Sequence, residues 1–379
     1  MSLNLPLHRR TVLLGAAGVA LAHSTPTWAQ TQRTGGKMPT LVQIADMSAG
    51  QIDVTKDFTL GTRAAWQDIN AKGGLRGRPL TLQTLEVDGT TASLRTAIEA
   101  IRAQPAVVGL LGTVGDRAAS QVADLLRREL PDIAHIAPWL QDSRQTAIDN
   151  TFSIFASRQE QIAHAIKSLS VMGINELGAV YATPAEYAAY REEVDQVALA
   201  LKLRLRTYGP VADLEQLGRT LTPDSPRIVI FLGGTPELLQ FSQGIGKQVA
   251  QRYIVAMADV NLQTLSQLGL SRNAAVIATQ VVPLVNAALP VVRAYRETLG
   301  RLYDEPPTPQ SLAGFMAGRY SYEVLLGIDG GLSRQTVLQA FQRRGAWDLG
   351  GFRVDTQSRQ RGNAYVTQSM ISADGRVVG

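Results

Sequence analysis

Residues 68–80, DINAKGGLRGRPL, join a predicted helix to a predicted strand. Gly73 and Gly74 end the helix, because glycine readily adopts the left-handed conformation that follows many helix C-termini. Gly77 permits a tight turn, and the apolar residues beyond it begin a strand. A helix followed closely by a strand is the unit that α/β proteins repeat, so this stretch favours an α/β fold.

The alternation of strands and helices extends on both sides of this turn. Before it, residues 41–45 form a short apolar run, and Phe58, Ala65 and Ile69 recur at helical spacing within residues 55–71. After it, the pattern predicts strand 80–87, helix 91–103, strand 106–111, helix 117–130 and strand 133–137. Such a series predicts a parallel sheet covered by helices.

A second alternating series begins near Ser157. It predicts helix 158–172, strand 177–181, helix 185–201, strands 203–207 and 227–232, helix 236–249, strand 253–257 and strand 276–282. Three helices then follow with no strand between them, at 290–302, 310–328 and 333–343. The simplest topology places these helices in the first lobe and strands 352–354 and 365–369 in the second.

These patterns divide the chain into two lobes. The first lobe is predicted to contain residues 40–156 and 284–345, and the second to contain residues 157–283 and 346–379. A chain of this length exceeds one typical domain and permits two cores.

The composition argues against several kinds of site. The chain has no cysteine, which excludes disulfides, thiolate metal sites and cysteine nucleophiles. Its 37 basic and 32 acidic residues give a formal charge of +5, and the basic residues are scattered rather than grouped with aromatic residues as in nucleic-acid binders. His135 and His164 fall in a predicted strand and helix, without the spacing of metal ligands. We expect no metal, no cofactor and no nucleic-acid partner.

The N-terminus has the pattern of a secretory signal peptide. Arg9 and Arg10 precede an apolar run at residues 11–22, which is shorter than the roughly 20 residues that span a bilayer. We expect cleavage after Ala29, so that residues 1–29 are removed and residues 30–39 form a linker. Removing 29 of the 379 residues leaves 350. The paired arginines also fit a twin-arginine signal, so both export routes to the periplasm stay open.

The turn at residues 68–80 resembles the INxxGGxxGRxL turn of the leucine/isoleucine/valine-binding family, the periplasmic solute-binding proteins of ABC transporters. Residues 107–112 (VVGLLG), 279–283 (TQVVP) and 348–352 (DLGGF) extend the resemblance over nearly all of the mature chain. It implies two Rossmann-like (flavodoxin-like) parallel-sheet lobes joined by three crossover segments, the type I periplasmic binding protein fold.

The resemblance implies binding rather than catalysis. Such a protein closes on a small polar solute, an amino acid or a related organic acid or amide, and delivers it as a monomer to a membrane permease. A sensor that signals through a receptor or kinase would use the same closure and remains an alternative. The sequence has no Gly-x-Ser-x-Gly elbow, and residues 112–117 lack the lysine of a nucleotide-binding loop, so we expect no enzyme.

Ligands of open parallel sheets bind beyond the carboxyl ends of the strands, so the loops after the strands supply the candidate contacts. In the first lobe, these are Asp46, Ser48, Thr113, Val114, Gly115, Asp116, Trp139 and Leu140. In the second lobe, they are Arg158, Tyr187, Thr235 and Asp259.

In the resembled family, the loop after the third strand presents hydroxyl and backbone N–H groups to a ligand carboxylate. Thr113 keeps one hydroxyl, but Val114 or Gly115 stands where a serine is expected. Asp116 would repel a carboxylate, unless it only caps the helix that follows. Trp139 either stacks on the ligand or seals the surface between the lobes.

The second-lobe candidates also rest on the resemblance. Tyr187 and Thr235 match a tyrosine and a polar residue of the family, and Asp259 either meets a ligand ammonium group or is a solvated loop residue. Arg158 pairs with a ligand anion or, as a structural contact, with Glu160 or Asp116.

Overall fold

The computed structural model describes residues 38–139, 149–171, 173–271, 273–343, 345–355, 365–372 and 375–379. The chain divides into a unit of residues 1–37 and a unit of residues 38–379, and all described residues belong to the second. The predicted signal peptide therefore lies outside the described residues, as does Leu140.

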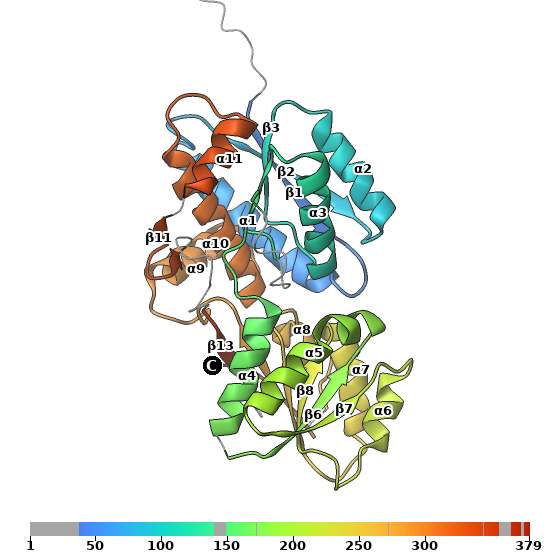
Figure 1. The fold of residues 1–379 in the computed structure, drawn as a ribbon. Helices are drawn as coiled ribbons and strands as arrows, with labels where there is room; N and C mark the ends of the chain where they lie inside the picture. Colours follow the sequence, from blue (N-terminus) through green and yellow to red (C-terminus); the bar gives the residue numbers. More distant parts are fainter. Residues whose placement is uncertain are drawn as a thin grey trace, which may run out of the picture. The chain divides into compact units, whose positions relative to one another are not determined.

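The first lobe is built on a five-stranded parallel sheet with the order β2-β1-β3-β4-β5. Its strands are β1 (Thr40–Asp46), β2 (Thr81–Val87), β3 (Val107–Leu111), β4 (Ala134–Ile136) and β5 (Thr151–Phe152). Helices α1 (Ile52–Ala71), α2 (Thr91–Arg102) and α3 (Asp116–Glu129) connect them (Figure 1). The chain order reverses at β1, and ligands of flavodoxin-like sheets bind beside such a reversal.

The second lobe repeats this order and extends it. Its seven-stranded sheet runs β14-β13-β10-β9-β8-β6-β7, and β6 to β10 are parallel in the same flavodoxin-like order. Its strands are β6 (Glu176–Tyr181), β7 (Arg204–Tyr208), β8 (Ile228–Leu232), β9 (Arg252–Ala256), β10 (Ala274–Gln280), β13 (Thr367–Ile371) and β14 (Val377–Val378). Its helices are α4 (Arg158–Val171), α5 (Pro184–Ala200), α6 (Leu214–Thr220), α7 (Thr235–Ile245) and α8 (Leu262–Gln267). The α/β class with two parallel-sheet lobes is confirmed.

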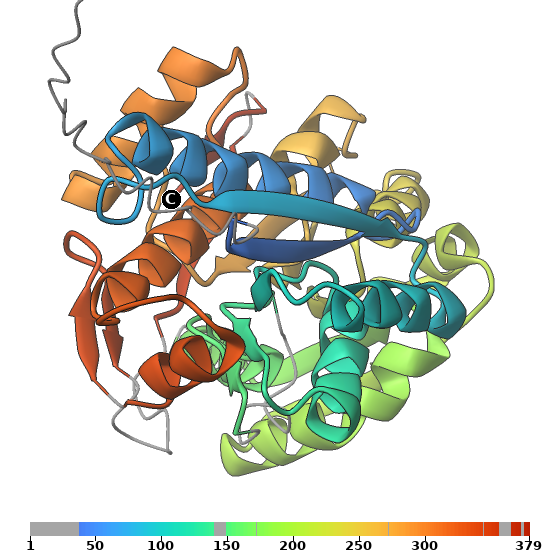
Figure 2. The same cartoon turned by 90° about the horizontal axis from the view of Figure 1, so that it is seen from above.

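Helices α9 (Pro290–Leu302), α10 (Pro309–Leu326) and α11 (Arg334–Gln342) return to the first lobe, as the absence of strands between them predicted. Helices α1 and α10 run side by side in both views (Figures 1 and 2). A Cβ atom at Gly61 would lie 1.7 Å from the carbonyl oxygen of Ser311, and one at Gly314 would lie 1.9 Å from that of Phe58. Glycine is therefore required on both helices, since their backbones touch.

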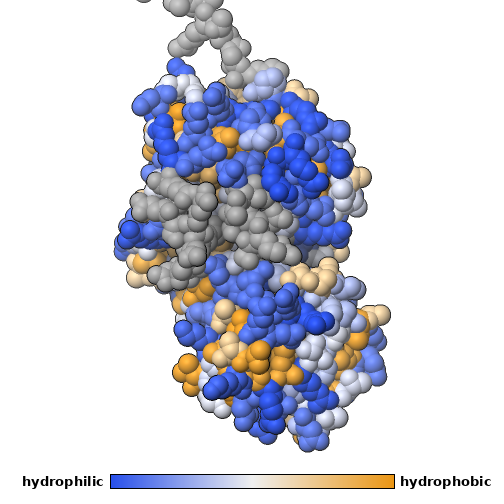
Figure 3. Space-filling view, in the orientation of Figure 1, coloured by the Kyte–Doolittle hydropathy of each residue, from blue (hydrophilic) through white to orange (hydrophobic). Residues whose placement is uncertain are grey.

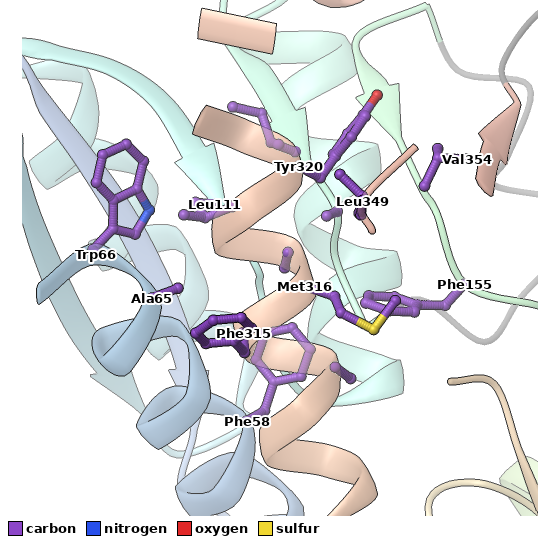
Figure 4. Close-up of a cluster of buried hydrophobic side chains, with 14 of the residues drawn as sticks. Phe58, Ala65, Trp66, Leu111, Phe155, Phe315, Met316, Tyr320, Leu349 and Val354 are labelled. Atoms are coloured by element: carbon purple, nitrogen blue, oxygen red, sulfur yellow. The ribbon is translucent and has the colours of Figure 1, made fainter. Parts of the chain in front are cut away.

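The terminal strands depart from the sequence prediction. Strand β13 joins the second sheet beside β10, but β12 (Arg353–Asp355) pairs with β11 (Ala346–Asp348) in a separate hairpin. Leu349, Phe352 and Val354 are buried in the first-lobe core, and Figure 4 shows Leu349 and Val354 across α10 from Trp66 of α1. The apolar side chains of residues 349–354 thus draw the hairpin to α10, so residues 352–354 do not join the second sheet. The exact lobe boundaries stay a prediction.

The surface of the described unit is mostly hydrophilic, and apolar side chains gather over part of the second lobe (Figure 3). Exposed apolar residues of this lobe include Val171 at the end of α4 and Leu199 near the end of α5. Among the described residues, none of the helices combines the length and apolar character needed to cross a membrane.

The contact between α1 and α10 can be tested by adding one methyl group. Gly314→Ala places a Cβ against the backbone of α1, and we expect a loss of unfolding free energy of about 1–3 kcal/mol or more. Gly300→Ala is the matched control, because no atom lies within 4 Å of its added Cβ on α9. It should be neutral or stabilising by up to about 1 kcal/mol. Urea unfolding measures both, and equal stabilities of the two variants would contradict the close contact.

Candidate functional site

A cavity of about 680 Å³ lies at the carboxyl ends of strands from both sheets. Loops after β1 and β2 and the start of α3 form its first-lobe wall, and the starts of α5 and α7 form its second-lobe wall. Its lining residues are Asp46, Ser48, Gly50, Gln51, Asp88, Gly89, Thr90, Thr91, Arg117, Ser120, Thr183, Ala185, Glu186, Ala189, Tyr190, Gly234 and Glu237.

Asp46 anchors the first-lobe wall. It is the last residue of β1, its side chain is 3 % exposed, and its Oδ1 accepts a hydrogen bond from the backbone N–H of Ser48 at 2.9 Å. A Cβ at Gly115 would lie 2.8 Å from Cβ of Asp46, and one at Gly89 would lie 3.0 Å from its Oδ1. Both glycines have positive φ, so they allow two loops to close around the carboxylate.

Asp88 is held by its own loop. Its Oδ1 accepts hydrogen bonds from the hydroxyl of Thr90 at 2.7 Å and from the Thr90 N–H at 2.9 Å. These hydrogen bonds lower the pKa of Asp88 and keep it ionised. Thr90 in turn caps α2 by accepting from the N–H of Ser93.

Two glutamates form the acidic part of the second-lobe wall. Glu186 and Glu237 are the third residues of α5 and α7, and each has a buried Oε2 that no donor among the described residues reaches. Burial raises the pKa of Glu186, opposed by the nearby Arg158 charge. The sequence offered a signal for Glu186, because Thr183 lies three residues before it in a capping pattern and does accept from its N–H.

The residues of the loop after β3 make contacts within the first lobe. Thr113 is buried, and its hydroxyl lies 2.8 Å from Nε2 of His135. The N–H of Val114 donates to the carbonyl of Ile44 at 3.0 Å, and Gly115 packs against Asp46. Asp116 begins α3, and its side chain lies outside the described part. Thr113, Val114 and Gly115 are not among the cavity-lining residues of the described chain.

Trp139 lies in the first-lobe core. Its side chain is 1 % exposed, with ring centroids 5.8 Å from Phe58 and 5.2 Å from Phe155. The structure does not bring it to the cavity lining, because this aromatic cluster encloses the indole.

The structure brings Arg158 and Asp259 together, and their side chains form an ion pair with each other. Both are buried, and the guanidinium donates to Oδ2 of Asp259 while lying 4.6 Å from the ring centroid of Tyr190. Glu160, one of the partners considered for Arg158, instead accepts from the N–H and hydroxyl of Ser157. The charges of Arg158 and Asp259 therefore compensate each other beside the cavity.

Thr235 connects the lobes. Its hydroxyl donates to Oδ2 of Asp53 on α1 at 2.7 Å and accepts from the N–H of Asn261 at 3.0 Å. Asn261 also donates to Oδ2 of Asp57 at 2.9 Å, a carboxyl whose pKa is raised by burial. Sequence reasoning missed Asp53 and Asp57, because the rule of loops after strands does not select residues inside a helix. It also missed Asn261, which follows Asp259 in the loop after β9 and caps α8.

Of the predicted contacts, Ser48 lines the cavity, together with Asp46 from the same loop. Tyr187 lies next to the lining residue Glu186, but its ring packs on Tyr181 with centroids 5.2 Å apart. Thr235 likewise adjoins the lining residue Gly234. Within the described ranges, no group of three or more acidic or histidine side chains could hold a metal ion.

The buried position of Trp139 changes the effect expected from its replacement. Trp139→Ala should lower the unfolding free energy by about 3–5 kcal/mol, because it leaves a cavity against Phe58 and Phe155. Trp139→Phe keeps an aromatic ring and should lower the unfolding free energy by less. Urea unfolding measures both. An alanine variant with unchanged stability would contradict the core role and would favour contact between Trp139 and the solute.

His135 should make the protein sensitive to acid. It is fully buried, and burial lowers its pKa to about 3, whereas an unfolded histidine titrates near 6.5. Below pH 6.5 the unfolded chain binds a proton that the folded chain does not, so unfolding free energy falls by up to about 1.4 kcal/mol per pH unit. His135→Gln should remove this slope between pH 6.5 and 4.5, and the variant of the exposed His164, His164→Gln, should keep it. Equal slopes for the two variants would contradict the assignment.

Comparisons with known proteins agree with this architecture. Residues 40–375 match the family model of periplasmic binding proteins. No curated protein matches the chain. An extracellular ligand-binding receptor from Verminephrobacter eiseniae is similar in structure, with a TM-score of 0.81 and 19 % identity over 90 % of this chain and 100 % of that one.

A branched-chain amino acid transporter substrate-binding protein from Streptococcus pneumoniae, in complex with isoleucine, is also similar. It has a TM-score of 0.75 and 13 % identity over 90 % of this chain and 98 % of that one. At these identities the structures support the fold alone. The family match spans nearly all of the described unit and confirms the family that residues 68–80 indicated, so the chain belongs to the periplasmic binding protein family.

Proposed function

We propose that this protein is the solute-binding component of an ABC transporter. It is exported to the periplasm, binds a small polar solute between its lobes as a monomer, and delivers the solute to a membrane permease. An amino acid or a related organic acid or amide is the class that the family resemblance favours.

The observation that carries the proposal is the shared cavity. Its walls come from the loops after β1 and β2 of one sheet and from the loops after β6 and β8 of the other. Ligand sites of doubly wound sheets lie at these carboxyl ends, and a volume of about 680 Å³ is in the range of small-molecule sites.

The contacts between the lobes support a closing mechanism. They include the hydrogen bonds from Thr235 to Asp53 and from Asn261 to Asp57. Gln310 of α10 adds a hydrogen bond to the carbonyl of Ala258 at 3.1 Å. Hydrogen bonds of this kind exchange readily with water, so a hinge motion can break and remake them, and a solute between the lobes would favour the closed state.

A thermal-unfolding screen tests the function. The purified protein is heated with members of a panel of amino acids, aromatic acids, amides and small dicarboxylates. A solute at about 100 times its dissociation constant should add roughly 2.7 kcal/mol to the unfolding free energy. No stabilisation by any member would count against this class of solute.

A matched pair of variants places the bound solute in the cavity. A Cβ at Gly50, which lines the cavity, would meet only Oε1 of Glu237, at 3.8 Å, so Gly50→Leu should fill the cavity and abolish the stabilisation by solute. Gly209→Leu is the control, because Gly209 is exposed and no atom lies within 4 Å of its added Cβ. Undiminished stabilisation of the Gly50→Leu variant would show that the solute binds elsewhere.

A further inference from the structure

The cavity wall is dominated by carboxylates. Asp46, Asp88, Glu186 and Glu237 line it, and Arg117 is the cation among the described lining residues. Arg117 is exposed on α3, whereas Asp46 is almost fully buried. The guanidinium of Arg158, which lies nearby, is already paired with Asp259.

The unsatisfied polar atoms of the wall all accept hydrogen bonds. Among the described lining residues, the buried side-chain atoms without a hydrogen-bond partner are Oε1 of Gln51, Oε2 of Glu186 and Oε2 of Glu237. Oδ1 of Asp53, in the first turn of α1, likewise has no hydrogen-bond partner among the described residues. A buried acceptor without a donor costs about 1–3 kcal/mol, and more when it is charged. A ligand that fits this wall therefore brings N–H donors.

A helix N-terminus explains only part of this arrangement. Glu186 and Glu237 sit in the first turns of α5 and α7, where the helix dipole favours negative charge. That interaction favours two partly buried carboxylates, but it leaves both Oε2 atoms without a hydrogen bond among the described residues. A ligand in the cavity, which both glutamates line, can supply the missing hydrogen bonds.

The groups that would hold a ligand carboxylate are engaged elsewhere. The hydroxyl of Thr113 faces His135, and burial lowers the pKa of this histidine, which keeps it neutral. The N–H of Val114 belongs to the pairing with β1. The third-strand loop, where the family resemblance placed the carboxylate, thus presents neither of these two donors.

We propose that the solute is a cationic amine, amidine or guanidine without a carboxylate, held by Glu186 and Glu237 on one lobe and by Asp46 on the other. This inference rests on the proposed function and narrows its small polar solute to a cation, in place of the amino-acid class that the family resemblance favours. The ligand donates N–H groups to the free Oε2 atoms, and its charge offsets the acidic wall.

Pairs of compounds that differ by one carboxylate test the proposal. Agmatine is compared with arginine, putrescine with ornithine, and isoamylamine with leucine, by calorimetric titration of the full protein. At least one amine should bind at least about tenfold more tightly than its parent amino acid. Glu186→Gln and Glu237→Gln should each weaken binding of the amine by about tenfold or more, because each removes a charged contact with the ligand. Glu192→Gln, an exposed position on α5 outside the cavity, is the control and should leave affinity unchanged.

The outcomes separate the inference from the function on which it rests. Tighter binding of the parent amino acids, or amine binding that both glutamine variants leave intact, would overturn the cationic class while preserving solute binding. Failure of every amine, while a member of the thermal-unfolding panel binds, would overturn the cationic class alone, and failure of every amine and every panel member would overturn both the class and the proposed function.

Discussion

The backbone contact between α1 and α10 is the constraint on which the rest of the structure depends. Gly61 and Gly314 remove the side chains that would hold these helices apart, and the aromatic residues of the first-lobe core pack around the contact (Figure 4). Helix α10 comes from the part of the chain that has already built most of the second lobe. The return is therefore fixed by close packing of two backbones, for which no residue other than glycine provides the space.

This contact also positions the side of the first lobe that faces the second. Asp53 and Asp57 belong to the first two turns of α1, and Gln310 lies in the first turn of α10. Because the two helices are locked together, these three side chains reach the second lobe as one rigid edge, where they meet Thr235, Asn261 and the carbonyl of Ala258. The residues that bridge the lobes are thus held by the core of the first, so in the proposed closing motion they would move together with that lobe.

The fold was largely predictable, because strand–helix alternation and glycine turns are local signals. The position of the hairpin of β11 and β12 was not predictable, since only its packing on α10 decides in which lobe residues 349–354 lie. The site was predictable at the level of loops, but less so at the level of residues. Ser48 follows β1 directly and lines the cavity, whereas Thr113 turns its hydroxyl to His135 and Arg158 turns to Asp259. A loop's place after a strand follows from topology, but the direction of a polar side chain depends on partners distant in sequence.

The electrostatics of the cavity connect binding to closure. In this structure Glu186 and Glu237 line the cavity together with Asp46, and burial raises the pKa of Asp57. In the proposed closing mechanism, closure without a solute would gather like charges and leave acceptors without donors, which would oppose the hydrogen bonds between the lobes. A ligand with cationic N–H groups would make the electrostatic energy of the closed state favourable instead of unfavourable. It would have less effect in the open state, where water reaches each carboxylate. Differential affinity of this kind is what a solute needs in order to shift the population from open to closed.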